Sequence, residues 1–183
     1  MAFDTYKNAT FYTAEQLNEE VAQDSHSQGA TLTKTLVNAS DVNTTQTKDT
    51  KYLHLSLGAA KLDGVDPNTG ETVSGREQRI RIEGDTIKKK ITSASAKAIF
   101  EIYNSLDEEI SVTLYYKGTK ASSLVTPAVT VNLKKGTNQL VFNLTDQVWS
   151  SAGKLQYVML SFGNKGDAAR EGIYLVGLTV YDN

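Results

Sequence analysis

The sequence contains no cysteine, only two prolines, one tryptophan and two histidines among its 183 residues. The absence of cysteine excludes a disulfide framework and a thiolate metal site, so packing and hydrogen bonds must stabilise the fold. The scarcity of proline excludes a collagen-like tract or a long disordered one. With 19 basic and 21 acidic residues, the formal charge of −2 is too balanced for nucleic acid to be held by counterion release. We therefore expect one ordinary folded domain and no nucleic-acid partner.

Membrane-directing segments are missing as well. The first seven residues, from Met1 to Lys7, lack the basic start and the apolar stretch of a secretory signal, and no later segment approaches the roughly 20 apolar residues of a membrane span. We expect no membrane insertion and no export signal. The start at Met1 and the absence of a purification tag favour a native, complete polypeptide.

The N-terminal 30 residues differ in pattern from the rest. Thr13 and Gln16 match a capping box, which predicts a short helix over about residues 14–22. Only Leu17 and Val21 offer it an apolar stripe, so this helix can lie on the domain but cannot organise it. We expect residues 1–30 to form an attachment element or lid and residues 31–183 to form the main domain.

From Thr31 onward apolar residues recur at every second position, which is typical of strands with one buried face. We count about ten such segments, including one at residues 86–91. Turn signals separate them too closely for crossover helices, so the strands should be antiparallel. The pattern predicts an all-β antiparallel sandwich, a jelly roll, with one short N-terminal helix. Clear examples of the alternation are Leu53, Leu55 and Leu57; Ile80 and Ile82; Ile110, Val112 and Leu114; and Leu140, Phe142 and Leu144.

Several segments also follow one another in an informative order. They are residues 11–17 (FYTAEQL), 51–58 (KYLHLSLG), 100–105 (FEIYNS), 107–114 (DEEISVTL), 133–138 (LKKGTN) and 173–182 (IYLVGLTVYD). In this order they resemble the galactose-binding-like jelly roll used by many carbohydrate-binding modules, over about residues 10–183. The resemblance implies a fold more firmly than an activity. Many members hold a structural calcium with an acidic pair near the end of the last strand, where this chain has Val176 and Gly177.

A cluster of oxygen-bearing side chains lies at the start of the second third of the chain. Its members are Asp63, Asp66, Asn68 and Glu71. Four such groups within nine residues suit calcium superficially, but the spacing is wrong for an EF-hand. The sequence Asp-Pro-Asn-Thr-Gly is also a good hairpin turn. We favour the turn and expect no metal site and no cofactor.

Exposed aromatic side chains with polar neighbours are the usual platform for a sugar ring. Alternation places Tyr52, His54 and Tyr115 on the outward register of their strands, and Trp149 lies in a turn-like stretch. The glycan-binding candidates are Tyr52, His54, Tyr115 and Trp149. The alternative is that these rings fill the ends and cross-strand gaps of the sandwich.

Basic residues gather on what the sequence predicts to be one hairpin. The candidate contact patch is Arg76, Arg79, Arg81 and Lys88, followed by Lys89 and Lys90. It suits a carboxylate, an acidic glycan or an acidic protein. The competing interpretation is a solvated strand edge, which charged residues protect against aggregation.

No motif indicates catalysis. The two histidines, His26 and His54, have no serine nucleophile in an elbow context, and no phosphate loop or two-histidine metal spacing is present. We expect no catalytic residues and no enzyme. Glu101 and Glu109 are the carboxylates that we considered as a glycosidase pair, but sequence does not give their separation.

Two functions remain. The first hypothesis is a virion accessory or decoration protein, for example of a phage, whose partners are other virion proteins or a cell-surface glycan. It accounts for a surface-type sandwich without an export signal. The alternative is a secreted carbohydrate-binding module or adhesin domain of a polysaccharide-acting protein. The expected location is the virion or the extracellular space.

Overall fold

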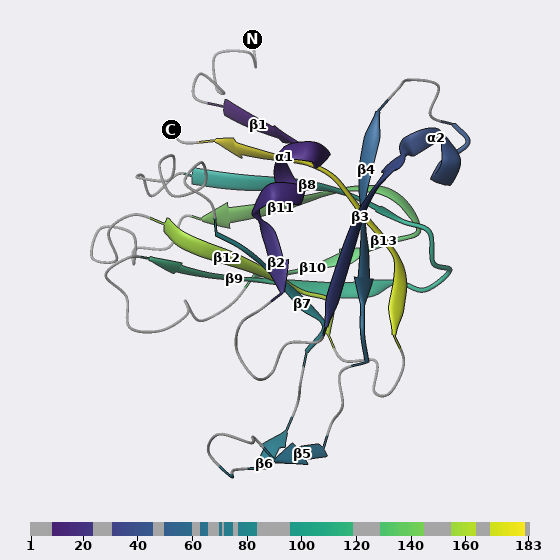
Figure 1. The fold of residues 1–183 in the computed structure, drawn as a ribbon. Helices are drawn as coiled ribbons and strands as arrows, with labels where there is room; N and C mark the ends of the chain where they lie inside the picture. Colours follow the sequence, from purple (N-terminus) through teal and green to yellow (C-terminus); the bar gives the residue numbers. More distant parts are fainter. Residues whose placement is uncertain are drawn as a thin grey trace.

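The computed structural model of the chain describes residues 9–23, 31–45, 50–59, 63–65, 70, 72–74, 77–83, 96–118, 129–144, 155–163 and 169–181. These residues form two main sheets whose strand pairs are all antiparallel, together with a separate hairpin (Figure 1). The predicted all-β antiparallel sandwich is confirmed.

The first sheet has six strands and the second has five. The six-stranded sheet has the order β11-β8-β13-β4-β3, with β1 paired to β13, and consists of β1 (Ala9–Thr13), β3 (Leu32–Asn38), β4 (Lys51–Leu57), β8 (Ala96–Asn104), β11 (Gly136–Leu144) and β13 (Arg170–Tyr181). The five-stranded sheet has the order β10-β9-β12-β7-β2 and consists of β2 (Val21–Gln23), β7 (Arg79–Ile82), β9 (Ile110–Gly118), β10 (Val129–Leu133) and β12 (Leu155–Ser161).

The core lies between these two sheets. Alternate residues of each strand point into it, because side chains of a β-strand alternate between its two faces. On β4, Leu53, Leu55 and Leu57 are fully buried, as the alternation predicts. Phe100 of β8 and Phe142 of β11 pack edge to face, with their ring centroids 6.0 Å apart. Each of the two main sheets therefore has one inner, apolar face and one outer face.

The N-terminal segment contributes to both sheets. β1 pairs with β13, and the chain then forms α1 (Ala14–Glu20) and enters β2, which pairs with β7 (Figure 1). The capping box is confirmed: the Gln16 amide donates to the Thr13 hydroxyl (3.3 Å), and the Thr13 amide donates to Gln16 Oε1 (2.9 Å). The helix ends two residues earlier than predicted, because Val21 begins the paired strand β2. Leu17 and Val21 are buried in the core.

Other elements were predicted less completely. The short strands β5 (Asp63–Val65) and β6 (Thr72–Ser74) pair as a hairpin, which agrees with the turn predicted between them. Asp66, Asn68 and Glu71 lie outside the described residues, as does the strand predicted at residues 86–91. The one-turn helix α2 (Ala39–Val42) was not predicted.

Candidate functional site

A discontinuity in the six-stranded sheet creates the candidate site. β8 pairs with β13 along one side of that strand, from Ile173 to Tyr181. On the other side β13 pairs first with β4, up to Leu175, and then with β1, from Gly177 onward. Since a strand has only two sides, β4 and β1 follow each other along the same one. Val176 lies where the register shifts, opposite the gap between them.

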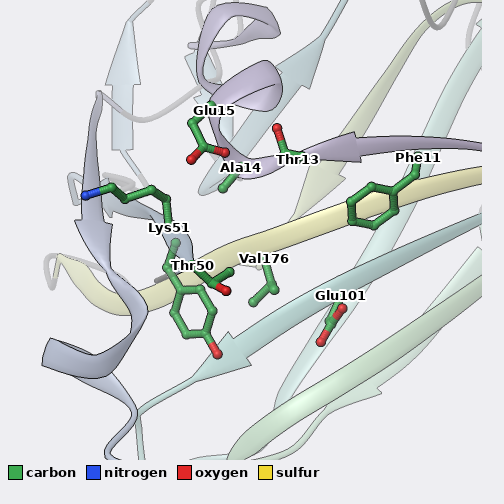
Figure 2. A pocket seen from close by; sticks show the side chains of 9 residues that line it. Phe11, Thr13, Ala14, Glu15, Thr50, Lys51, Glu101 and Val176 are labelled. Atoms are coloured by element: carbon green, nitrogen blue, oxygen red, sulfur yellow. The ribbon is translucent and has the colours of Figure 1, made fainter. Parts of the chain in front are cut away.

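A pocket of about 400 Å³ occupies this gap (Figure 2). Its residues come from the end of β1 and the start of α1, from the start of β4, and from the outer faces of β8 and β13. They are Phe11, Thr13, Ala14, Glu15, Thr50, Lys51, Tyr52, Glu101 and Val176. The volume falls within the range of about 300–1,000 Å³ that is usual for small-ligand sites.

An exposed aromatic ring forms one wall of the pocket. The side chain of Phe11 is 58% exposed, although aromatic residues of this size are usually buried. The ring lies against Gly177: a Cβ atom added to Gly177 would come within 3.1 Å of Phe11 Cε2 and Cζ. The absence of a side chain at position 177 therefore allows the ring to approach the backbone of β13.

Apart from Ala14 and Val176, the rest of the lining is polar, and it carries an excess of negative charge. Within the part of the chain that the structure describes, the carboxylates of Glu15 and Glu101 have neither a hydrogen-bond nor an ion-pair partner. Lys51 is the only cation that lines the described pocket, and its Nζ donates to Asn38 Oδ1. Figure 2 shows the Lys51 ammonium directed away from the pocket. Two carboxylates are thus available to accept hydrogen bonds from a ligand.

Three tyrosines and a histidine continue the outer face beside the pocket; we call Tyr52, Tyr103, Tyr174 and His54 the tyrosine cluster. The centroid distances are 5.8 Å between Tyr52 and Tyr103, 6.1 Å between Tyr103 and Tyr174, and 6.4 Å between Tyr52 and Tyr174. The His54 ring stacks on Tyr174 at 4.8 Å. Tyr52 belongs to both the cluster and the pocket lining, so the two features adjoin.

Hydrogen bonds and charge hold the cluster in place. Nε2 of His54 donates to the backbone carbonyl oxygen of Glu171, which can only accept, so this nitrogen carries the proton. The Ser56 hydroxyl donates to the Glu171 carboxylate at 2.8 Å. Burial raises the pKa of Tyr174, and the nearby Tyr103 and Glu171 raise it further. Tyr174 therefore remains a neutral hydrogen-bonding phenol at neutral pH.

The predicted glycan residues do not share one surface. Tyr52 and His54 lie on the outer face of β4, but Tyr52 is only 2% exposed, because the other cluster rings and Asn43 surround it; its expected exposure is wrong. Tyr115 lies on the outer face of the other sheet, where burial, then the charge of Glu77, raises its pKa. Trp149 is outside the described residues.

The predicted basic patch is partly described. Arg79 and Arg81 share the outer face of β7, as the alternation predicts. Each has an acidic neighbour, Glu77 at 3.6 Å from Arg79 and Glu83 at 3.0 Å from Arg81, and Arg81 also lies 3.8 Å above the Tyr157 ring. β7 lies between β12 and β2, so the expectation of an exposed strand edge is wrong for this strand. Arg76 and Lys88 lie outside the described residues.

Metal and membrane features are absent from the described residues. No group of three or more histidine or acidic side chains there is placed to hold a metal ion. Neither described helix has the length and apolar character needed to cross a bilayer.

Several residues of this surface were missed by sequence reasoning. Tyr103 and Tyr174 alternate with buried neighbours, so the same period of two that selected Tyr52 could have placed them on the outer face. No local pattern identifies Phe11 or Val176 as pocket residues, because the gap depends on which strands pair with β13.

Solved structures with similar folds include carbohydrate-binding modules. The family 22 binding module and family 10 catalytic module of an endo-1,4-β-D-xylanase from Clostridium thermocellum, in complex with xylohexaose, match with a TM-score of 0.54 and 9% identity over 97% of this chain and 29% of that chain. A low-affinity xylan-binding module, CBM86, from Roseburia intestinalis matches with a TM-score of 0.50 and 14% identity over 94% of this chain and 93% of that chain.

The glycoside hydrolase domain structure of Endo-D from Streptococcus pneumoniae R6 matches with a TM-score of 0.51 and 17% identity over 89% of this chain and 21% of that chain. The chain thus spans less than a third of the two hydrolase structures but nearly the whole of the xylan-binding module. No family model and no curated protein sequence matches the chain. Together with the two antiparallel sheets, the structural matches show that the chain has the jelly-roll β-sandwich fold of carbohydrate-binding modules.

Proposed function

We propose that the protein is a non-catalytic carbohydrate-binding domain whose ligand binds on the outer face of the six-stranded sheet, in the pocket between β1 and β4. The observation that carries the proposal is that the exposed Phe11 ring lines the same pocket as Glu15 and Glu101, whose carboxylates have no partner among the described residues. A sugar ring has apolar C–H faces that pack on an aromatic ring and hydroxyl groups that donate to carboxylates. The pocket offers both kinds of contact.

The tyrosine cluster favours an oligosaccharide over a single sugar. Tyr103 and Tyr174 are partly exposed on strands that also line the pocket, and the phenol of Tyr52 reaches both regions. A chain of sugars that starts in the pocket would next meet these hydroxyl-bearing rings. Among the residues predicted from sequence, we retain Tyr52 and His54 as members of this surface; the buried Tyr52 ring would support Tyr103 and Tyr174 from below rather than offer a flat face to the sugar.

The structural matches give no support to the virion hypothesis. They favour the alternative, because two of the matching structures contain carbohydrate-binding modules. The similar hydrolase structures are much longer than this chain, so their overall coverage does not assign a catalytic role to it. We therefore propose an extracellular polysaccharide-binding role.

Affinity electrophoresis against soluble polysaccharides, followed by isothermal titration calorimetry with the matching oligosaccharide, tests the proposal. We expect Phe11→Ala to weaken binding at least tenfold, because it removes the stacking surface. Val141→Ala is the matched control, since Val141 is an exposed apolar residue of the same sheet (44% exposed) that does not line the pocket. Equal binding by Phe11→Ala and the wild-type protein would contradict the assignment of the pocket.

The same experiment separates this surface from that of Tyr115. Tyr115→Ala changes a ring on the outer face of the other sheet and should leave binding unchanged. Loss of binding with Tyr115→Ala but not with Phe11→Ala would move the site to that sheet.

A further inference from the structure

The charge of the pocket indicates which sugars it accepts. Glu15 and Glu101 contribute two negative charges, and Lys51 contributes one positive charge that is already engaged with Asn38. α1 itself contains three glutamates and no basic residue; Lys34 of β3 donates to the carbonyl oxygens of Asn18 and Val21 at the end of the helix but does not line the pocket. A ligand in the pocket therefore meets a net negative field.

The available hydrogen-bonding groups have the same bias. A carboxylate accepts hydrogen bonds but does not donate them when it is ionised. The carboxylates of Glu15 and Glu101 have no partner in the described chain and are reached by solvent, so they are available to donors of the ligand. The carboxylate or sulfate of an acidic sugar offers only acceptors and a like charge, which would be repelled.

The Phe11 ring points to the same chemistry. The face of an aromatic ring carries negative quadrupole charge and attracts a cation as well as C–H groups. Phe11 is 58% exposed at the wall of a pocket that Glu101 also lines (Figure 2). An exposed ring that shares a pocket with carboxylates lacking a partner among the described residues is suited to an ammonium group attached to a ring with an apolar C–H face.

We infer that the pocket selects amino sugars with a free, protonated amine, such as the glucosamine units of a deacetylated chitin-like polysaccharide, over neutral sugars and over uronic acids. This inference rests on the proposed function and specifies the ligand of the same site. The amine would pair with Glu101 while the sugar ring packs on Phe11, and Glu15 would add to the negative charge of the lining.

Titration with three hexasaccharides tests this inference: a glucosamine hexamer, an N-acetylglucosamine hexamer and a galacturonate hexamer, in mildly acidic buffer of low ionic strength. The first two differ at each amine only by an acetyl group, which removes the charge. We expect the glucosamine hexamer to bind about tenfold more tightly than the acetylated one, and the galacturonate hexamer not to bind. The preference should disappear at about 1 M salt, where the Debye length is about 3 Å.

Two isosteric variants connect the preference to the pocket. Glu101→Gln should bring the affinities for the glucosamine and N-acetylglucosamine hexamers to within about twofold of each other, because the amide keeps the shape but not the charge. Glu109→Gln is the matched control, an exposed glutamate outside the pocket, and should retain the full preference.

The outcomes distinguish this inference from the proposed function. Equal or tighter binding of the acetylated or galacturonate hexamer, or a preference that Glu101→Gln leaves intact, would overturn the amino-sugar selectivity while glycan binding itself would stand. Failure of all three hexamers and of the polysaccharide panel to bind would overturn the proposed function, and this inference with it.

Discussion

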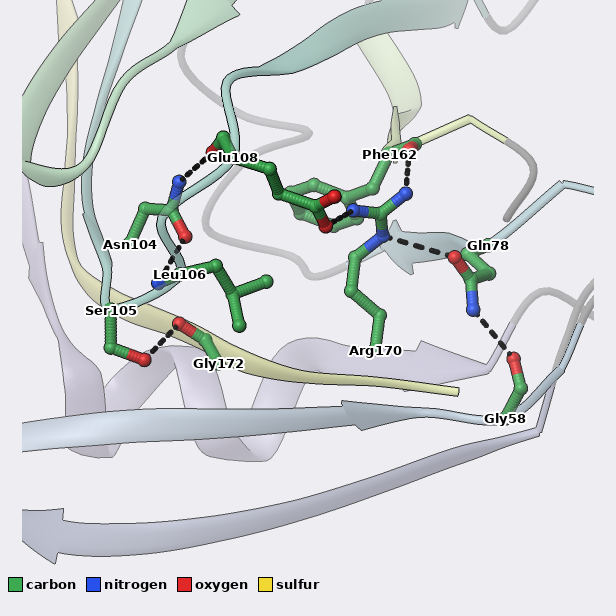
Figure 3. Close-up of polar contacts among 9 residues, drawn as sticks. All are labelled: Gly58, Gln78, Asn104, Ser105, Leu106, Glu108, Phe162, Arg170 and Gly172. Carbon is green, nitrogen blue, oxygen red and sulfur yellow. Dashed lines mark hydrogen bonds and ion pairs between the residues drawn. The ribbon is translucent and has the colours of Figure 1, made fainter. Parts of the chain in front are cut away.

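Arg170 offers the sharpest test of how the sandwich is stabilised. Its side chain is only 6% exposed at the start of β13, and its guanidinium donates to three acceptors (Figure 3). Nε reaches Gln78 Oε1 at 3.0 Å, Nη1 reaches Glu108 Oε1 at 3.0 Å, and Nη2 reaches the Phe162 carbonyl oxygen at 3.1 Å. Gln78 in turn donates a hydrogen bond from Nε2 to the Gly58 carbonyl oxygen at 2.9 Å. One side chain thus joins the ends of several strands.

The loss of folding free energy on removing this side chain depends on the acceptors that it now serves. Arg170→Met keeps much of the buried volume but removes the hydrogen bonds that Arg170 donates to Gln78 Oε1 and to the Phe162 carbonyl oxygen, at about 1–3 kcal/mol each. Glu108 is 44% exposed, so water can solvate its carboxylate and reduce its share. The new apolar contacts of methionine offset about 1 kcal/mol. We expect the free energy of unfolding to fall by about 2–4 kcal/mol, which corresponds to roughly 5–15 °C in a domain of this size.

Urea denaturation followed by circular dichroism measures this change. Arg170→Lys should fall between Arg170→Met and the wild-type protein, because it keeps the charge but loses the planar fork. Lys135→Met is the control: Lys135 forms an ion pair with Asp107 in which both side chains are well exposed, so its loss should leave the midpoint unchanged. A stability of Arg170→Met within about 0.5 kcal/mol of wild type, at an unchanged m-value, would refute the reasoning.

Three further predictions follow from residues around the pocket. Gly177→Ala should displace the Phe11 ring, because the added Cβ would lie 3.1 Å from it. We expect glycan binding measured by calorimetry to weaken severalfold, and the free energy of unfolding measured in urea to fall by about 1 kcal/mol. Unchanged binding would contradict the role of this close approach. Thr13→Ala should lower the free energy of unfolding by about 1 kcal/mol through loss of the cap, whereas Thr13→Ser should not; equal effects would exclude capping as the cause. Burial, and secondly the charge of Glu20, raise the pKa of Tyr12 to about 12. The neutral phenol therefore contributes its full stability below the unfolded pKa of about 10, and this stability is lost as the pH rises through about 12. Tyr12→Phe should flatten this alkaline decline in thermal melts, and an unchanged decline would assign it to other groups.

Strand faces were predictable because alternation depends only on local geometry. Leu53 and Leu55 had to point to one side of β4 and Tyr52 and His54 to the other, whatever strands lay beside them. The exposure of Tyr52 was not predictable in the same way. It is buried on the outer face because the rings of Tyr103 and Tyr174 come from strands that are distant in the sequence.

The basic patch shows a second limit of sequence reasoning. Arg79 and Arg81 were correctly assigned to one face of a strand. Sequence alone could not show whether that strand lies at an edge, and the pairing of β7 with both β12 and β2 places it inside the sheet. Their acidic neighbours, Glu77 and Glu83, flank the strand in sequence, but only their side-chain conformations decide whether the charges pair.

By itself, the sequence determined the all-β class, the inner and outer positions along strands such as β4 and β9, and the capped helix that begins at Ala14. These features follow from interactions between residues that are close along the chain. The tertiary structure decided that β4 and β1 share one side of β13, and so created the pocket at Val176. That choice depends on the relative stability of long-range strand pairings. Such pairings join residues that are far apart in the sequence, so no local pattern predicts which of them forms.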